Sequence, residues 1–505
     1  MKKMFFKGAG RRVLPLLFFI SILHSGSFKW TIGLYMAGDN DLAPALDEDL
    51  REIKRARINN DINVVVFADR GMYSESPGTF IYVKRDTFLV PLIDLSNLDS
   101  GDPATLSFFI SYLKNNFPSE SYALVIWGHG TGWFKGDNFF YKSVAYDASS
   151  TNSIDVFNGE LSTTIPDSLF NVLIFDACLM GSVEVLVELQ NKARYVIASP
   201  ALVPAYGFNY TALLEAFVIE EVENLLRRIV DDFVQFYDSL GLTVSLAIYD
   251  LSRIEMSVKV LENVVASSYL KTTTELLKYR FSVSTYNTFS NEIFDSTAIF
   301  ADLVEFLRKG WSIESLPLVL YAKGNLRLKN SSFLSVYFPV NYSVLKRDFS
   351  KYGCLRFERR VRFLDLVLNA LRDTLMEGDT VMVHYIEGKD GYMIVLQNLI
   401  KASKWLCELN VERDGTIKQT VYSNSKKFFL KLTPGLYRFY LRVITNNPTT
   451  FYSLRLSPDT LKVEDGSTPY YNSLVSNFES GFDVLGRKSS KAKIFFKNHK
   501  KHIVY

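Results

Sequence analysis

The chain has 505 residues, of which 48% are hydrophobic and 22% charged, which is enough for a large core and two or more domains. The formal net charge of +3 falls to −2 without residues 1–27, which contain five basic and no acidic residues. Residues 487–505 carry seven more basic groups and no acid, so the body has a charge of −9, which argues against nucleic acid as the main partner.

The first 27 residues have the composition of a signal peptide. Five basic residues accompany the apolar run Val13–Leu23, and Ser25, Gly26 and Ser27 supply small residues for cleavage. The run is shorter than the ~20 residues of a membrane span. We therefore expect a secreted or cell-envelope protein with no integral span after cleavage. The alternative is an uncleaved N-terminal anchor.

Strand and helix patterns then alternate as in an α/β protein. Apolar runs of strand length are Trp30–Met36, Ile62–Ala68, Tyr122–Trp127, Asn171–Phe175 and Tyr195–Ala198. Helical patterns between them are Ala43–Ala56, Leu106–Asn115 and Ser182–Leu189, and 80–84 with 87–92 form an antiparallel pair. This order predicts a mostly parallel sheet with helices on both faces.

The later pattern changes near residue 379. Before it we expect helices at 220–237, 298–309 and 357–376, a mostly helical stretch at 254–278, and strands at 243–249 and 333–338. After it, short alternating strands at 381–386, 392–396, 428–432 and 437–443 predict a small antiparallel β-sandwich with a structural or binding role. The predicted domains are the signal peptide 1–27, an α/β domain 28–376, the β-sandwich 377–465 and a basic tail 466–505. The tail could contact an anionic surface, and the alternative is a solvated terminus.

Two reactive residues stand at the ends of apolar strands. His129 follows the run that ends at Trp127, and Cys178 follows the run that ends at Phe175. The carboxyl ends of parallel strands are where ligands bind in such sheets. The three cysteines are an odd number, so at least one thiol stays unpaired even if Cys354 and Cys407 form a disulfide. The pattern indicates a Cys/His nucleophilic enzyme.

The residues around this pair suit that chemistry. A cysteine attacks as thiolate, and we expect a helix that begins after Cys178 to lower the thiol pKa. Glycines 128, 130 and 132 let backbone amides approach a substrate, and His129 would act as acid and base. The alternative is a buried cysteine and a structural histidine, but a structural histidine needs no glycines around it.

The motifs Trp-Gly-His-Gly-Thr-Gly-Trp (127–133) and Asp-Ala-Cys-Leu-Met-Gly (176–181) resemble those of the clostripain family of cysteine peptidases. The family belongs to a clan with caspases, gingipains and legumain, and the resemblance covers residues 29–375. It implies a caspase-like sheet, His129 as catalytic histidine and Cys178 as nucleophile. It further implies an oxyanion hole from the amides of Gly130 and Cys178, in the loop that Gly128 opens. A peptide or protein is the implied substrate, and no cofactor is required.

The resemblance also bears on specificity. Family members cut after Arg or Lys, and Asp176 matches an acidic position that faces the basic side chain; its alternative role is a helix N-cap. Ser199 lies where the family binds substrate, but the segment 198–204 lacks the acid that the family commonly places there. A smaller or more apolar pocket is the alternative.

Two further family traits concern maturation and calcium. Some members mature by internal cleavage, and Lys135 and Lys142 are the candidate sites in the insert between the two motifs. Some members depend on calcium, and Asp39 and Asp41 are candidate ligands, although a loop that enters a helix favours the same residues.

The sequence therefore predicts an exported cysteine endopeptidase that works through a Cys178 thioacyl-enzyme. One alternative is a transamidase or peptide ligase of the same clan, which resolves the thioacyl-enzyme with an amine. Another is a non-catalytic surface-binding protein with a degenerate peptidase fold.

Overall fold

The computed structural model describes residues 28–71, 74–134, 143–286, 298–339 and 342–371, together with strands between residues 380 and 504. The predicted signal peptide lies outside the described residues. Within the described part of the chain, no helix is both long and apolar enough to span a bilayer.

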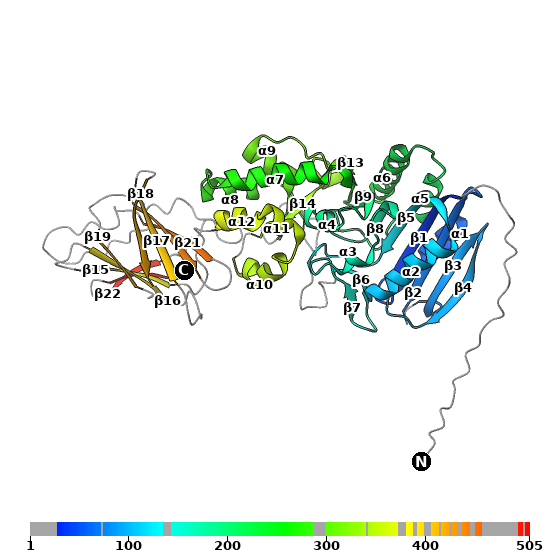
Figure 1. The fold of residues 1–505 in the computed structure, drawn as a ribbon, viewed down its shortest axis with the longest axis horizontal. Coiled ribbons are helices and arrows are strands. Elements are labelled where there is room, and N and C mark those ends of the chain that lie inside the picture. The colour runs from blue at the N-terminus through cyan, green and yellow to red at the C-terminus, as the bar shows by residue number, and fades with distance from the viewer. Residues whose placement is uncertain are drawn as a thin grey trace, which may run out of the picture.

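A large sheet forms the centre of the N-terminal part (Figure 1). Its nine described strands are, in spatial order, β13 (Val319–Gly324), β10 (Ser245–Asp250), β9 (Ala193–Ala198), β8 (Phe170–Asp176), β5 (Ser119–Trp127), β1 (Phe28–Gly38), β2 (Ile62–Arg70), β3 (Gly78–Arg85) and β4 (Phe88–Ser96). The five central strands, β9 to β2, are parallel. The outer strands are antiparallel and include the predicted β3–β4 pair. The predicted, mostly parallel sheet is confirmed.

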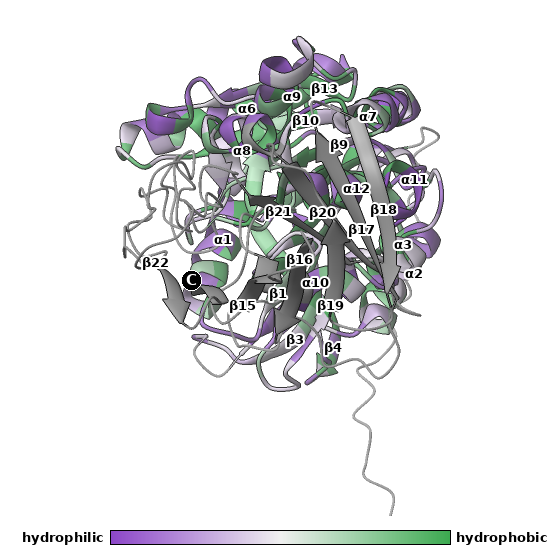
Figure 2. Ribbon diagram, turned by 90° about the vertical axis from the view of Figure 1, so that its left-hand side faces the viewer, coloured by the Kyte–Doolittle hydropathy of each residue, from purple (hydrophilic) through white to green (hydrophobic). Residues whose placement is uncertain are grey.

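Helices cover both faces because the central strands are apolar on both sides. On one face lie α1 (Ala43–Arg55), α5 (Tyr210–Ala216) and α6 (Val222–Ser239). The other core contains residues of α2 (Pro103–Asn116), α3 (Glu160–Thr164), α4 (Val183–Glu188), α7 (Ile254–Ser268), α8 (Thr273–Phe281), α9 (Leu303–Trp311), α10 (Tyr342–Tyr352), α11 (Arg356–Val361) and α12 (Phe363–Leu371). Outer helices such as α6 and α9 carry both polar and apolar bands (Figure 2), as expected when one side of a helix packs on a core.

Two predicted helices differ from the structure. Residues 300–302 of the predicted helix 298–309 form strand β12 (Phe300–Asp302), which pairs with β11 (Thr285–Tyr286) and β14 (Ser335–Tyr337). Helix α9 begins only after Asp302. The Asp302 side chain accepts a hydrogen bond from the Glu305 amide and so caps the helix. The predicted helix 357–376 is interrupted at Arg362, whose φ of 56° separates α11 from α12. Its residues beyond 371 lie outside the described residues.

The insert between the two motifs contains a hairpin that the sequence patterns did not predict. Strands β6 (Val144–Asp147) and β7 (Asn152–Ile154) pair with each other, and Val144 also bridges to Gly130. The Ala148 amide donates to the carbonyl of Asp39. The hairpin therefore links the histidine loop to the loop that follows β1.

The C-terminal strands form two small antiparallel sheets. One contains β19 (Lys427–Lys431), β16 (Gly391–Gln397), β15 (Thr380–Ile386), β23 (Lys500–Val504) and β22 (Lys493–Lys497). The other contains β18 (Thr416–Ser423), β17 (Leu406–Arg413), β20 (Tyr437–Ile444) and β21 (Thr450–Leu456). The predicted antiparallel strands are confirmed. The expectation of a tail beyond residue 465 that is solvated throughout is wrong, because β23 pairs with β15. Contact of this tail with an anionic surface stays a prediction.

Candidate active site

The ends of β5 and β8 bring the two motifs together. The strands are parallel neighbours in which Trp127 is level with Asp176, and the Gly128 amide donates to the Asp176 carbonyl at 3.1 Å. A Cβ atom at position 130 would lie 2.6 Å from the carbonyl oxygen of Cys178, closer than real Cβ contacts allow. Only glycine fits at position 130, and the absence of a side chain there lets the histidine loop lie against the Cys178 backbone.

His129 has an acidic neighbour that the sequence reasoning assigned to another role. Its Nε2 atom lies 2.7 Å from Oδ1 of Asp41, in the loop after β1, and the imidazole is partly exposed. Asp41, a candidate calcium ligand from the sequence, thus contacts the histidine in the structure. A detectable signal was the position of Asp41 at the carboxyl end of β1, the strand next to β5.

The thiol of Cys178 is held by the segment that follows β9. The Val203 amide donates to Sγ at 3.3 Å, and Sγ in turn lies 3.5 Å from the Val203 carbonyl oxygen. The Leu179 and Gly181 amides donate to the carbonyls of Ala201 and Ser199. Residues 199–203 therefore run beside residues 178–181 as a hydrogen-bonded pair of segments.

The expected activation of Cys178 by a helix start is wrong. The helix predicted at Ser182–Leu189 is present as α4, with Ser182 as its N-cap, but its first turn lies beyond the cysteine motif and does not lower the thiol pKa. Although part of the residue is exposed, desolvation by the surrounding protein raises the pKa of the thiol to about 11. The hydrogen bond from Val203 opposes this rise, and the negative charge of Asp176 adds to it. In this conformation the thiol is protonated at neutral pH.

Two backbone amides remain available next to Cys178. A Cβ at position 130 would lie 3.1 Å from the Cys178 nitrogen, so the two backbones are adjacent. Among the hydrogen bonds of the described residues, neither the Gly130 N–H nor the Cys178 N–H is a donor. The Gly128 amide, by contrast, is used in the bond to Asp176. The arrangement offers two donors for a developing oxyanion.

Asp176 anchors the loop before α5. Its Oδ2 atom accepts from the Phe208 amide and the Tyr210 hydroxyl, both at 3.1 Å, and Gly207 packs directly against the carboxylate. The alternative of a helix N-cap is wrong, since Ser182 caps the next helix. Burial raises the pKa of Asp176 to about 6, so the group is ionised at neutral pH.

Ser199 is fully buried rather than exposed to a pocket. Its hydroxyl donates to the Ala201 carbonyl at 3.1 Å, accepts the Ala201 amide at 3.0 Å and lies 3.3 Å from the Ser245 hydroxyl. This burial argues against direct contact between the Ser199 side chain and a substrate.

Two acids of α1 lie close to Asp176, and sequence patterns gave no sign of them. Asp49 accepts from the Trp127 indole at 2.8 Å, and Glu52 accepts from the Tyr210 amide at 2.7 Å. Burial, followed by repulsion from Asp176, raises the pKa of Asp49 to about 10. Asp49 is therefore neutral at pH 7, and Asp176 carries the negative charge next to it.

The remaining predicted residues fall in several places. Lys135 and Lys142 lie outside the described residues. The Cys354 thiol is free and exposed, so a disulfide with Cys407 is not formed. Asp39 lies near Asp69 and Asp147, and these three carboxylates could hold a metal ion.

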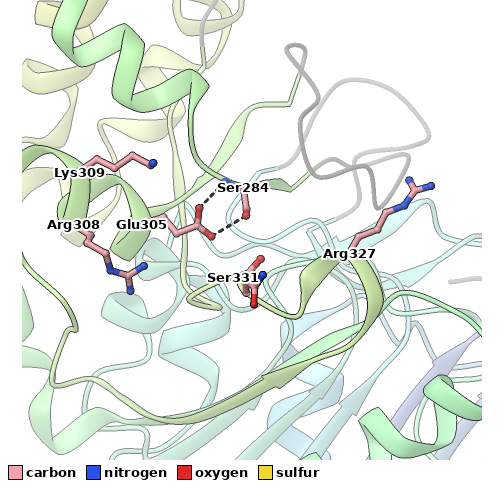
Figure 3. A pocket seen from close by; sticks show the side chains of 7 residues that line it. Ser284, Glu305, Arg308, Lys309, Arg327 and Ser331 are labelled. Carbon is pink, nitrogen blue, oxygen red and sulfur yellow. Dashed lines mark hydrogen bonds between the residues drawn. The ribbon is translucent and has the colours of Figure 1, made fainter.

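A polar pocket of about 340 Å³ lies apart from the two motifs. Figure 3 shows Glu305 hydrogen-bonded to Ser284, with Arg308, Lys309 and Arg327 around the opening. Neither His129 nor Cys178 lines it.

A histidine loop and a cysteine lie at neighbouring carboxyl ends of this sheet, the arrangement of a caspase-like fold. A family model for the clostripain family matches residues 34–339, more than half of the chain. The chain belongs to the clostripain family.

Comparison with individual proteins agrees with this family assignment. The chain is 26% identical over 219 residues to clostripain from Hathewaya histolytica, a match that spans 37% of this chain and 42% of clostripain. An inactive zymogen of a C11 protease from Parabacteroides distasonis is similar in fold, with a TM-score of 0.54 and 20% identity over 66% of this chain and 99% of that one. A secreted C11 cysteine protease from Bacteroides thetaiotaomicron, bound to an irreversible peptide inhibitor, also gives a TM-score of 0.54, with 18% identity over 66% of this chain and 99% of that one.

The raised pKa of Cys178 predicts slow alkylation. In the intact chain with His129→Ala, which prevents self-cleavage, we expect iodoacetamide at pH 7.5 to modify Cys178 at least ~30-fold more slowly than the exposed Cys354. The rate at Cys178 should rise up to about pH 11, as the thiolate forms. Peptide mass spectrometry measures both sites in one sample. Equal rates at pH 7.5 would contradict the described environment of the thiol.

The contact between Asp41 and His129 predicts a role in positioning. Asp41→Asn should lower kcat by roughly tenfold with a smaller change in KM, because the carboxylate orients the imidazole. Asp94→Asn, which changes an exposed acid of edge strand β4, is the matched control. Steady-state kinetics on a fluorogenic peptide measure the effect, and an unchanged kcat would rule out the role.

Proposed function

We propose that the chain is an exported cysteine endopeptidase in which Cys178 is the nucleophile and His129 the acid/base. The observation that carries this proposal is the close packing of Gly130 on the Cys178 backbone. It fixes the histidine loop and the cysteine at one edge of the sheet, next to two amides with no acceptor among the described residues.

The chemistry follows from these groups. The Cys178 sulfur, as thiolate, attacks the peptide carbonyl, and the amides of Gly130 and Cys178 stabilise the negative oxygen that forms. The C–N bond then breaks as protonated His129 gives its proton to the leaving amine. Water, deprotonated by His129, attacks the thioacyl-enzyme and releases the acid product and the thiol.

The preference for a basic residue before the cut rests on Asp176. This buried acid is ionised at neutral pH and lies two residues before the nucleophile, under the loop that contains Phe208. A charged guanidinium or ammonium group gains most from such a desolvated carboxylate. The segment 199–203 adds no acid, so Asp176 would carry the preference with little help from that side.

Export and maturation complete the proposal. The composition of residues 1–27 and the secreted relative from Bacteroides thetaiotaomicron support export. The protonated thiol, tied to Val203, fits a precursor, and one similar fold belongs to an inactive zymogen. Cleavage at Lys135 or Lys142 is the step proposed to convert this precursor into the active peptidase.

A peptide panel tests activity and specificity together. The processed protein should hydrolyse Arg- and Lys-terminated fluorogenic peptides at least ~10-fold faster than neutral ones, and Cys178→Ala should abolish turnover. Asp176→Asn keeps the acceptor for Phe208 and Tyr210 but removes the charge, so the preference should shrink by roughly tenfold.

The control and the contrary outcomes are distinct. Asp250→Asn changes another buried acid that caps a turn, a role that asparagine fills equally well, and should leave the preference intact. Faster cleavage of neutral peptides would overturn the basic preference alone. Equal turnover by Cys178→Ala would overturn the peptidase assignment, and joined peptides in the mass spectrum would indicate ligation.

Processing has its own test. The double variant Lys135→Ala/Lys142→Ala should remain intact and keep slow alkylation of Cys178, whereas the wild type should be cut and then react with iodoacetamide below pH 8. Lys259→Ala, which changes an exposed lysine of α7, is the control. Gel analysis and mass spectrometry locate the cut. Cleavage of the double variant at the wild-type rate would contradict the proposed sites.

A further inference from the structure

The polar pocket beside α9 is lined only by polar and charged residues of the described part of the chain. Two arginines and a lysine supply positive charge, one glutamate supplies negative charge, and two serines and an asparagine complete the lining. Its volume of about 340 Å³ falls within the ~300–1,000 Å³ of small-ligand sites, which are mostly apolar. A pocket of this size with a net positive lining suits an anionic ligand.

Two of the three cations are unpaired. Nε of Arg308 donates to Oε2 of Glu314 at 2.8 Å, so this guanidinium already has an acidic partner. Lys309 and Arg327 are exposed and form no ion pair or hydrogen bond with the residues that the structure describes. Figure 3 shows them on opposite sides of the pocket, Lys309 on α9 and Arg327 on the short 3₁₀ helix Leu326–Leu328. Their charges are therefore available to a ligand.

Hydrogen bonds fix the polar groups between these two cations. Glu305 accepts from the Ser284 amide at 2.9 Å and from the Ser284 hydroxyl at 2.8 Å. Buried Asp302 accepts from the Ser332 amide at 2.7 Å, directly after Ser331. The Ser331 hydroxyl is itself buried and makes no hydrogen bond of ordinary length. A buried hydroxyl in this state is available to a polar ligand that enters the pocket.

We propose that this pocket binds an acidic segment of a polypeptide, whose carboxylates are met by Lys309 and Arg327. Arginine donates to a carboxylate through two parallel N–H groups, and lysine meets it as a point charge. The Ser331 hydroxyl and the Asn330 amide add donors for peptide carbonyls. Cations on two sides of the pocket favour a ligand with several anionic groups over a single small anion. Peptides and proteins are also the substrates of the family to which the chain belongs.

A short segment links the pocket to the cysteine motif. Ser335, in β14, lies four residues after Ser331, a distance of at most ~14 Å along the chain. Its amide donates to the Gly181 carbonyl at 3.1 Å, and it bridges to Ser182. The pocket would thus be a secondary contact for a protein substrate whose cut site lies elsewhere in its own chain. This consequence rests on the proposed function, whereas binding of the acidic segment does not.

The test uses the intact chain with Cys178→Ala, so that peptidase activity plays no part. Anisotropy of fluorescently labelled hexaglutamate in about 150 mM NaCl should show saturable binding, and hexaglutamine should not bind. Lys309→Gln/Arg327→Gln should weaken binding at least ~10-fold, because it removes both unpaired cations. Ser331→Ala, which changes no charge, should weaken binding roughly threefold through loss of the donor.

The control removes the same charge at a distance from the pocket. Arg57→Gln/Lys259→Gln changes two exposed cations, one after α1 and one on α7, and should bind as tightly as the parent. Both double variants keep the basic residues 487–505, so equal affinities would assign binding to that tail and overturn the proposed site. Absence of saturable binding would refute the proposal. Tighter binding of a sulfated oligosaccharide, or equal binding of hexaglutamine, would overturn the ligand class.

Discussion

The candidate active site depends on one close backbone contact, the packing of Gly130 against the Cys178 backbone. Parallel strands bring β5 and β8 side by side, but side chains normally keep the loops beyond such strands apart. Here the bond from Gly128 to the Asp176 carbonyl extends the pairing past the strand ends, and the missing side chain at position 130 removes the last steric barrier. The relative position of histidine and thiol is thus set mainly by backbone, which is stiffer than a contact between two long side chains.

A second constraint on the site is electrostatic, because buried acidic residues lie at the ends of neighbouring strands. Asp176 lies beneath the loop before α5, and Asp39, Asp69 and Asp147 lie beyond the ends of β1, β2 and β6. Desolvation raises the pKa of both Asp176 and Asp69, and hydrogen bonds from neighbouring donors oppose the rise at each of them. An enzyme that recognises cations needs ionised, poorly hydrated carboxylates. The same property makes each of these acids a cost to the free protein, which a bound cation or substrate would offset.

The sequence patterns correctly predicted the strands and helices that follow from local hydrophobic periodicity. They failed for elements and residue roles that depend on tertiary contacts. Apolar runs located the central strands, and their ends located His129 and Cys178, because parallel topology places such ends at one edge. The strand β12 was missed because residues 300–302 continue a helical pattern, and only pairing with β11 and β14 makes them extended. The contact between Asp41 and His129 could not be read from local spacing, and its one signal was that β1 and β5 end side by side. The alternative role of Asp176 as an N-cap failed because the chain takes six residues to reach the true cap, Ser182.

The described conformation separates assembly of the site from activation of its nucleophile. The histidine loop, the two amides and the acids are in place, yet the thiol has a pKa of about 11 and is bonded to Val203. Desolvation is the main cause of this state, and the Val203 amide, in the segment that lies along residues 178–181, opposes it. Lowering the pKa of the thiol requires water, a cation or His129 to come closer to the sulfur. The proposed activation then needs only a local change around the sulfur, because the strands that hold the two reactive residues are already paired side by side.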